Sequence, residues 1–145
     1  LRKFEKTVND KRISFHNEGL WNEEAKLYFS GGVSGGERII QEPTDKDGNA
    51  VPIKVTAIDV VPECENATFI KMDIEGAEMN ALLGGINTIK RNRPKLAISI
   101  YHSNEDMLRI PEWCINNLEN YHFYIRHHHY LPGDTVFYAI PTKIY

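Results

Sequence analysis

The stretch Thr68–Glu78, TFIKMDIEGAE, decides the fold of this chain. It opens with an apolar run typical of a buried strand and changes, after Gly76, to the spacing of an amphipathic helix. Asp73 and Glu75 lie between the two, at the carboxyl end of the predicted strand. Open α/β sheets bind their ligands at that end of the strands. We therefore expect Asp73 and Glu75 to contact a ligand; the alternative is that both cap the helix and complement its dipole.

Composition indicates one soluble domain of ordinary size, because the 145 residues are 41% hydrophobic. A net charge of −3 argues against the clustered basic surface of nucleic-acid-binding proteins. No apolar run reaches the ~18–20 residues that a membrane span needs. We expect neither nucleic acid nor membrane as a partner. Cys64 and Cys114 lack the spacing of a metal site and are interpreted as free thiols, which indicates the cytoplasm.

Alternating strand and helix patterns extend along the chain. The expected strands are 13–17, 26–29, 53–58, 68–74, 95–101, 122–130 and 135–140, and the expected helices are 76–93 and one that starts near Pro111. Residues 26–58 are interpreted as a hairpin insertion around two turn-rich segments, 31–37 and 45–49. Residues 1–9 have the pattern of a helix end, and residues 131–134 that of a tight turn. This order predicts an α/β fold with a mostly parallel sheet that ends in an antiparallel strand.

Several blocks in this order resemble the FkbM family of S-adenosylmethionine-dependent methyltransferases. They are NEGLW at 17–21, FIKMDIEGAE at 69–78, ALLGG at 81–85, RPKLAISIYH at 93–102, FYIRHHHY at 123–130 and TVFYAI at 135–140. The resemblance implies a Rossmann-like sheet of seven strands with the last antiparallel. It also implies S-adenosylmethionine as cofactor and transfer of a methyl group to a hydroxyl of a small molecule or glycan.

The same resemblance implies a glycine-rich loop after the first strand and an acid after the second, and this sequence has neither. We therefore expect residues 1–145 to form the C-terminal part of one methyltransferase domain, without its first two strands, and to bind S-adenosylmethionine poorly. The family's strand order is three-two-one-four-five-seven-six. The strand at 68–74 would then have an open edge, which favours association into a homo-oligomer.

Candidate site residues come from several strand ends. We expect catalytic roles for Asp73, Glu75 and His102, cofactor contacts from Glu18, Gly19, Leu20 and Asp73, and substrate contacts from Arg126 and His127. His102 ends the strand next to Asp73, and a histidine suits the removal of a hydroxyl proton, with Asp73 as the other candidate base. Glu78 lies in the first helical turn and is interpreted as a capping residue outside the site.

The run Arg126–His129 raises the question of a metal. One strand can direct only two of the three adjacent histidines to a common point, so no metal is assigned. Two other functions stay open. A metal-dependent hydrolase could use Asp73, Glu75, His102 and His127 as ligands, and a non-catalytic binding domain could keep the fold without the cofactor site.

Overall fold

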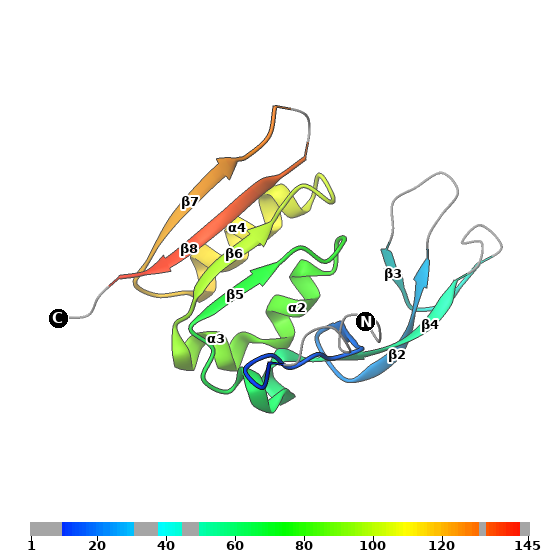
Figure 1. Cartoon of the computed structure of the whole chain (residues 1–145). Helices are drawn as coiled ribbons and strands as arrows, with labels where there is room; N and C mark the ends of the chain where they lie inside the picture. The colour runs from blue at the N-terminus through cyan, green and yellow to red at the C-terminus, as the bar shows by residue number, and fades with distance from the viewer. Residues whose placement is uncertain (1–9, 31–37, 45–49, 131–132, 143–145) are drawn as a thin grey trace.

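The structure is a computed structural model that describes residues 10–30, 38–44, 50–130 and 133–142. Expectations for 1–9, 31–37, 45–49 and 131–132 lie outside the described residues. The strands are β1 (Gly19–Leu20), β2 (Ala25–Ser30), β3 (Arg38–Ile40), β4 (Val51–Thr56), β5 (Phe69–Met72), β6 (Lys95–Ser99), β7 (Tyr121–His127) and β8 (Thr135–Pro141). The helices are α2 (Glu78–Gly84), α3 (Ile86–Asn92) and α4 (Asp106–Asn117), with short 3₁₀ turns η1 (Ile58–Val60) and η2 (Pro62–Cys64). Figure 1 shows a mixed α/β fold with two separate sheets.

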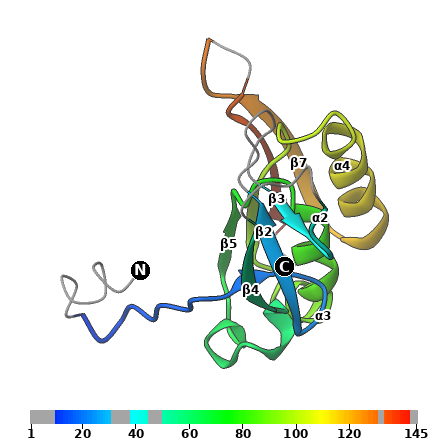
Figure 2. The same cartoon turned by 90° about the vertical axis from the view of Figure 1, so that its right-hand side faces the viewer.

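The larger core belongs to the sheet with strand order β5-β6-β8-β7. This order agrees with the four-five-seven-six order implied for the last strands of the FkbM family. Helices α2, α3 and α4 cover one face of the sheet, as the two perpendicular views show (Figures 1 and 2). Side chains between the helices and the sheet are fully buried, among them Met72, Leu82, Ile89, Leu96, Ile98, Ile110 and Phe137.

The expectation of a mostly parallel sheet needs correction. Only the pairs β1–β4 and β5–β6 are parallel, and the other strand pairs are antiparallel. Two of the antiparallel pairs involve β8, which lies between β6 and β7 and runs against both of them. The other two involve β2, which runs against β3 and β4. The sequence patterns predict strands and their alternation with helices, but they do not predict where a hairpin strand inserts.

The expected continuous helix over 76–93 is wrong, because the structure has two helices that meet at Gly85. A Cβ atom on Gly84 would lie 2.1 Å from the carbonyl oxygen of Trp21. One on Gly85 would lie 3.0 Å from the side chain of Ile58. Close packing of the two glycines therefore brings α2 and α3 against β1 and η1. Asp59 in η1 accepts hydrogen bonds from the free N–H groups at the start of α3.

Helix α4 begins at Asp106, several residues before the expected start at Pro111, which lies inside the helix. The Ser103 hydroxyl accepts a 3.0 Å hydrogen bond from the backbone N–H of Asp106, which satisfies one of the free donors of the first turn. The sequence signal for the start of α4 is therefore the pair Ser103 and Asp106, three residues apart. Pro111, the expected first residue of the helix, is not its start.

The second sheet has the order β1-β4-β2-β3 and lies beyond α2, away from the β7–β8 hairpin (Figure 1). The expected pairing of segments 26–29 and 53–58 is confirmed, because β2 and β4 are antiparallel neighbours. The expected strand at 13–17 is wrong. Its residues join no sheet in the described structure, and Ile13 is half exposed. The strand in this region is the short β1, which pairs with β4 in parallel.

Across the described ranges, no helix is long and apolar enough to cross a membrane. Both cysteines are free, as expected. Cys114 lies on the buried face of α4, where burial raises the pKa of its thiol to about 12.

Candidate functional site

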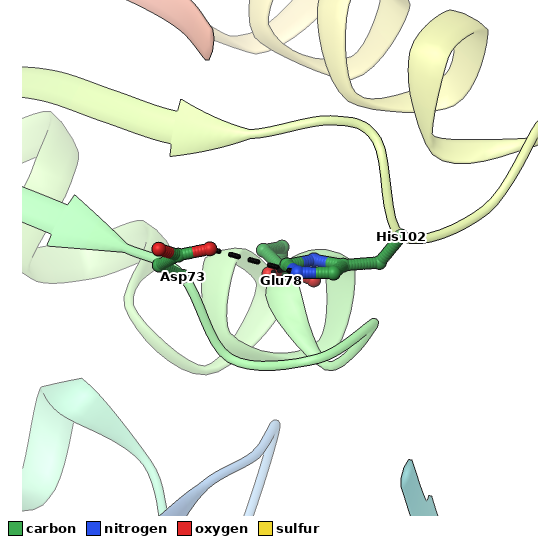
Figure 3. Close-up of side chains that lie close together, drawn as sticks. All are labelled: Asp73, Glu78 and His102. Atoms are coloured by element: carbon green, nitrogen blue, oxygen red, sulfur yellow. Dashed lines mark ion pairs between the residues drawn. The ribbon is translucent and has the colours of Figure 1, made fainter. Parts of the chain in front are cut away.

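Acidic side chains and one histidine meet at the carboxyl ends of β5 and β6. Asp73 directly follows β5, and His102 lies shortly after β6. Because the two strands are parallel, their carboxyl ends lie at the same edge of the sheet. In the close-up, Asp73 and His102 point toward each other from neighbouring loops (Figure 3). The expected proximity of Asp73 and His102 is confirmed.

His102 is enclosed by carboxylates. Its Nε2 atom lies 3.5 Å from Oδ1 of Asp73 and 3.6 Å from Oε2 of Glu75. The imidazole is shielded, with 8% of the side chain exposed, whereas the side chains of Asp73 and Glu75 are 41% and 51% exposed. The cluster therefore presents two accessible carboxylates in front of a histidine that solvent hardly reaches.

The turn between β5 and α2 brings Glu75 into this cluster. Glu75 and Gly76 both adopt positive φ angles, 56° and 90°. Glycine takes such a conformation without a steric penalty, but a glutamate in it costs of order 1–3 kcal/mol. Backbone strain of this kind concentrates at functional sites. The strain is thus located at a residue that contacts His102.

Asp73 is held by two donors. The Tyr101 hydroxyl donates a 3.0 Å hydrogen bond to Oδ1, and the ammonium group of Lys71 lies 3.1 Å from Oδ2. Burial raises the pKa of Asp73. Hydrogen bonds from Ser99, Lys71 and Tyr101 act in the opposite direction and prevail, so the pKa lies below its ordinary value. Burial and the hydrogen bond to Asp73 raise the pKa of Tyr101 to about 12. At neutral pH, Asp73 is ionised and Tyr101 is a neutral donor.

Glu78, which the sequence interpretation left out, belongs to the cluster. Its side chain is completely buried, and Oε1 lies 2.8 Å from Nδ1 of His102. The same oxygen accepts a 2.8 Å hydrogen bond from the backbone N–H of Ile74. Side chains in the first turn of a helix point back toward its N-terminus, here toward the end of β5. This direction was the signal that could have placed Glu78 in the site.

Several buried atoms of the cluster lack hydrogen bonds. The contact between Glu78 and Nδ1 of His102 is short, but it does not have the geometry of a hydrogen bond. Three buried atoms therefore have no hydrogen-bond partner among the described residues: Nδ1 of His102, together with its Nε2 and Oε2 of Glu78. Buried polar groups are nearly always hydrogen-bonded, and exceptions call for an explanation such as an ion.

Arg126 and His127 lie at the same edge of the sheet but not in the cluster. Strand β7 runs in the same direction as β6, with β8 between them. At about 4.8 Å per strand, the end of β7 lies about 14 Å from β5. His127 pairs with the Thr135 hydroxyl at 2.9 Å, and no contact described for Arg126 or His127 reaches Asp73 or His102. The contact with substrate predicted for these two residues stays a prediction.

Three of the residues predicted to contact a cofactor lie at β1: Gly19 and Leu20 form the strand, and Glu18 directly precedes it. The Glu18 carboxylate pairs with Lys54 at 2.7 Å. A Cβ atom on Gly19 would lie 3.1 Å from Val55, so packing against β4 also favours glycine there. Leu20 packs against the core. Glu18 and Gly19 line an open pocket of about 420 Å³ between this segment and β4, which has the volume of a small-molecule site.

Comparison with known proteins identifies the family to which this fold belongs. Residues 2–130 match the family described as the methyltransferase FkbM domain. The chain belongs to the FkbM methyltransferase family. The crystal structure of methyltransferase FkbM from Methylobacillus flagellatus KT is 31% identical in sequence and superimposes with a TM-score of 0.69. That match covers 95% of this chain.

The FkbM chain described here spans 31% of the length of the Methylobacillus flagellatus protein. Among curated proteins, none matches it. The family membership supports a methyltransferase fold.

Proposed function

We propose that this FkbM domain is part of an S-adenosylmethionine-dependent methyltransferase that methylates a hydroxyl group of a sugar or another small metabolite. The observation that carries the proposal is the meeting of Asp73, Glu75 and His102 at the carboxyl ends of two parallel strands. Ligands of open α/β sheets bind at such ends. The family supplies the class of reaction, and the cluster supplies the groups that methylation of a hydroxyl needs.

The residues of the cluster divide the work of binding and deprotonation. Asp73 stays ionised because its pKa is lowered, so its carboxylate can accept a hydrogen bond from the hydroxyl and orient it. Lys71 and Tyr101 fix that carboxylate. The hydroxyl proton passes to Nε2 of His102 or to the Asp73 carboxylate as the hydroxyl oxygen attacks the methyl group. Nε2 of His102 faces both accessible carboxylates.

S-adenosylmethionine, when bound, supplies an activated methyl group. The residues present fit part of this cofactor, because the open pocket at Glu18 and Gly19 has room for a nucleoside and the Glu18 carboxylate can accept hydrogen bonds from its hydroxyls. Asp73 is the second residue to which we assign a cofactor contact. Free, partly or fully buried cysteines fit a reducing compartment, and we place the protein in the cytoplasm.

Release of S-adenosylhomocysteine by the intact enzyme that contains this domain, measured with a panel of sugars and small alcohols as acceptors, tests this function. Asp73→Asn and His102→Gln should each lower turnover by about 10²-fold, the scale for loss of acid–base catalysis. Glu105→Gln, in an exposed ion pair on α4, serves as the matched control and should leave turnover unchanged. Turnover within threefold of the unaltered protein in both site variants would remove the cluster from the reaction.

A further inference from the structure

We propose that Asp73, Glu78 and His102 bind one divalent transition-metal cation. Each residue offers one ligand atom, and the three atoms lie within 4.8 Å of one another. Atoms bound to one cation at about 2.1 Å lie at most about 4.2 Å apart. A small inward movement of the accessible Asp73 side chain is enough to complete the set.

The buried atoms without hydrogen bonds point to a ligand at this place. The Glu78 side chain is fully buried and His102 nearly so, yet Oε2 of Glu78 and both ring nitrogens lack a hydrogen-bond partner within the described structure. Leaving a buried polar atom unsatisfied costs about 1–3 kcal/mol, and more when the group is charged. A cation would satisfy a carboxylate oxygen and a ring nitrogen at once (Figure 3).

The charge of the cluster has the right sign and size. Asp73, Glu75 and Glu78 contribute three carboxylates, and Lys71 is the cation that contacts them. With a neutral imidazole, the ionised cluster carries two excess negative charges. A divalent cation balances them. The backbone N–H of Ile74 already binds Oε1 of Glu78, which holds this carboxylate in place for a ligand.

The donor types select the cation. Carboxylate oxygens alone would suit Mg²⁺ or Ca²⁺, but an imidazole nitrogen in the set favours first-row transition metals such as Mn²⁺ and Zn²⁺. Three ligand atoms do not fill the coordination shell of such a cation. The accessible side of the cluster, at Asp73 and Glu75, leaves room for a further ligand of the cation. This inference concerns cation binding and stands without methyl transfer; only its consequence, a lowered pKa of a bound acceptor hydroxyl, rests on the proposed function.

A protonated His102 would neutralise one of the two excess negative charges, and it needs no metal. Calorimetric titration of chelator-treated protein with Mn²⁺, Zn²⁺ or Mg²⁺ alone separates the two. We expect one equivalent of Mn²⁺ or Zn²⁺ per chain and at least tenfold weaker binding of Mg²⁺. The bound transition metal should also raise the thermal unfolding temperature.

Glu78→Gln and His102→Gln should each weaken cation binding by at least tenfold, the scale for altered groups at metal sites. Circular dichroism checks that the variants are folded, and Asp73→Asn carries the test if Glu78→Gln is not. The matched control is Glu63→Gln. Glu63 also contacts a histidine, His16, but this pair is exposed and lies outside the cluster. Absence of stoichiometric binding, or binding that the site variants leave unchanged, would overturn the proposal. Absence of methyl transfer by the unaltered enzyme, with cation binding intact, would instead contradict the proposed function.

Discussion

The backbone N–H of Ile74 and the buried carboxylate of Glu78 are joined by a 2.8 Å hydrogen bond across the turn that follows β5. The same carboxylate contacts Nδ1 of His102 from the other side. One side chain therefore fixes the turn that carries Asp73 and Glu75 and, at the same time, limits the position of the histidine. Glu78 therefore both supports the turn and contacts His102. Substitutions that keep or remove its hydrogen bond to Ile74 can separate these two roles.

Glu78→Ala should destabilise the protein by about 1–3 kcal/mol, because it leaves the Ile74 N–H without its acceptor in a buried place. Glu78→Gln keeps a carbonyl oxygen in the same position and should lose less than half as much. Urea unfolding followed by circular dichroism measures both. Equal losses in the two variants would show that the charge of Glu78, and not its hydrogen bond to Ile74, supports the turn.

The contact of α2 with β1 depends on Gly84. A Cβ atom there would lie 2.1 Å from the carbonyl oxygen of Trp21, an atom of the backbone that cannot rotate away. Gly84→Ala should therefore cost about 3 kcal/mol or more, at the upper end of the range for overpacking. Gly85→Ala is the matched control, because its Cβ atom would make longer contacts, 3.0 Å to Cδ1 and 3.1 Å to Cβ of Ile58. A similar loss of unfolding free energy in the two variants would contradict this packing argument.

Local patterns predicted the cores of most elements well. The apolar runs ending at Met72 and Ser99 are strands, and the acids and histidine that follow them meet at one edge. This works because the carboxyl ends of parallel neighbours are necessarily close. Local sequence patterns did not predict the boundaries of the elements or the contacts between distant segments. The helix break at Gly85 depends on Ile58, which lies in a different part of the chain.

Glu78 shows the same limit within the site. A glutamate in the first helical turn is most often a solvent-exposed residue that complements the helix dipole, so the sequence alone favoured that interpretation. Its burial results from the loop after β6, which places His102 above it. Arg126 and His127 were expected in the site but lie outside the cluster. Their position at the carboxyl-end edge of the sheet was predicted correctly, but β8 lies between β6 and β7 and keeps them away from the cluster.

The free edge of β5 should drive association of the 145-residue chain. In the described structure β5 pairs only with β6, and Phe69 on this edge strand is 59% exposed. Unpaired edges that carry exposed apolar side chains favour pairing between copies. Phe69→Lys should therefore shift sedimentation toward the monomer. Leu108→Lys is the control, an exposed apolar residue on α4 that should leave the distribution unchanged. A monomer at all concentrations before substitution would contradict the prediction.

Asp59 joins η1 to the start of α3. Its Oδ1 accepts a 2.7 Å hydrogen bond from the N–H of Thr88, and Oδ2 accepts bonds from the backbone and side-chain N–H groups of Asn87. Burial raises the pKa of this carboxyl. The hydrogen bonds from Thr88 and Asn87 prevail, so its pKa lies below the ordinary value of 3.8. The ionised form is thus the one that the folded protein stabilises.

Asp59→Asn should destabilise the protein by about 1 kcal/mol at neutral pH, through the loss of a helix-capping charge. Because the folded state lowers the pKa, the stabilisation by Asp59 is fully present above about pH 4, and it disappears as the pH falls below 3.8 through the folded value. Urea unfolding of both proteins between pH 7 and pH 2.5 measures the difference in unfolding free energy, which should shrink toward zero at the acid end. Glu105→Gln, in an exposed pair with Arg109 on α4, should change stability by no more than about 0.5 kcal/mol throughout. A difference for Asp59→Asn that is constant with pH would mean that its hydrogen bonds to α3 do not depend on the charge.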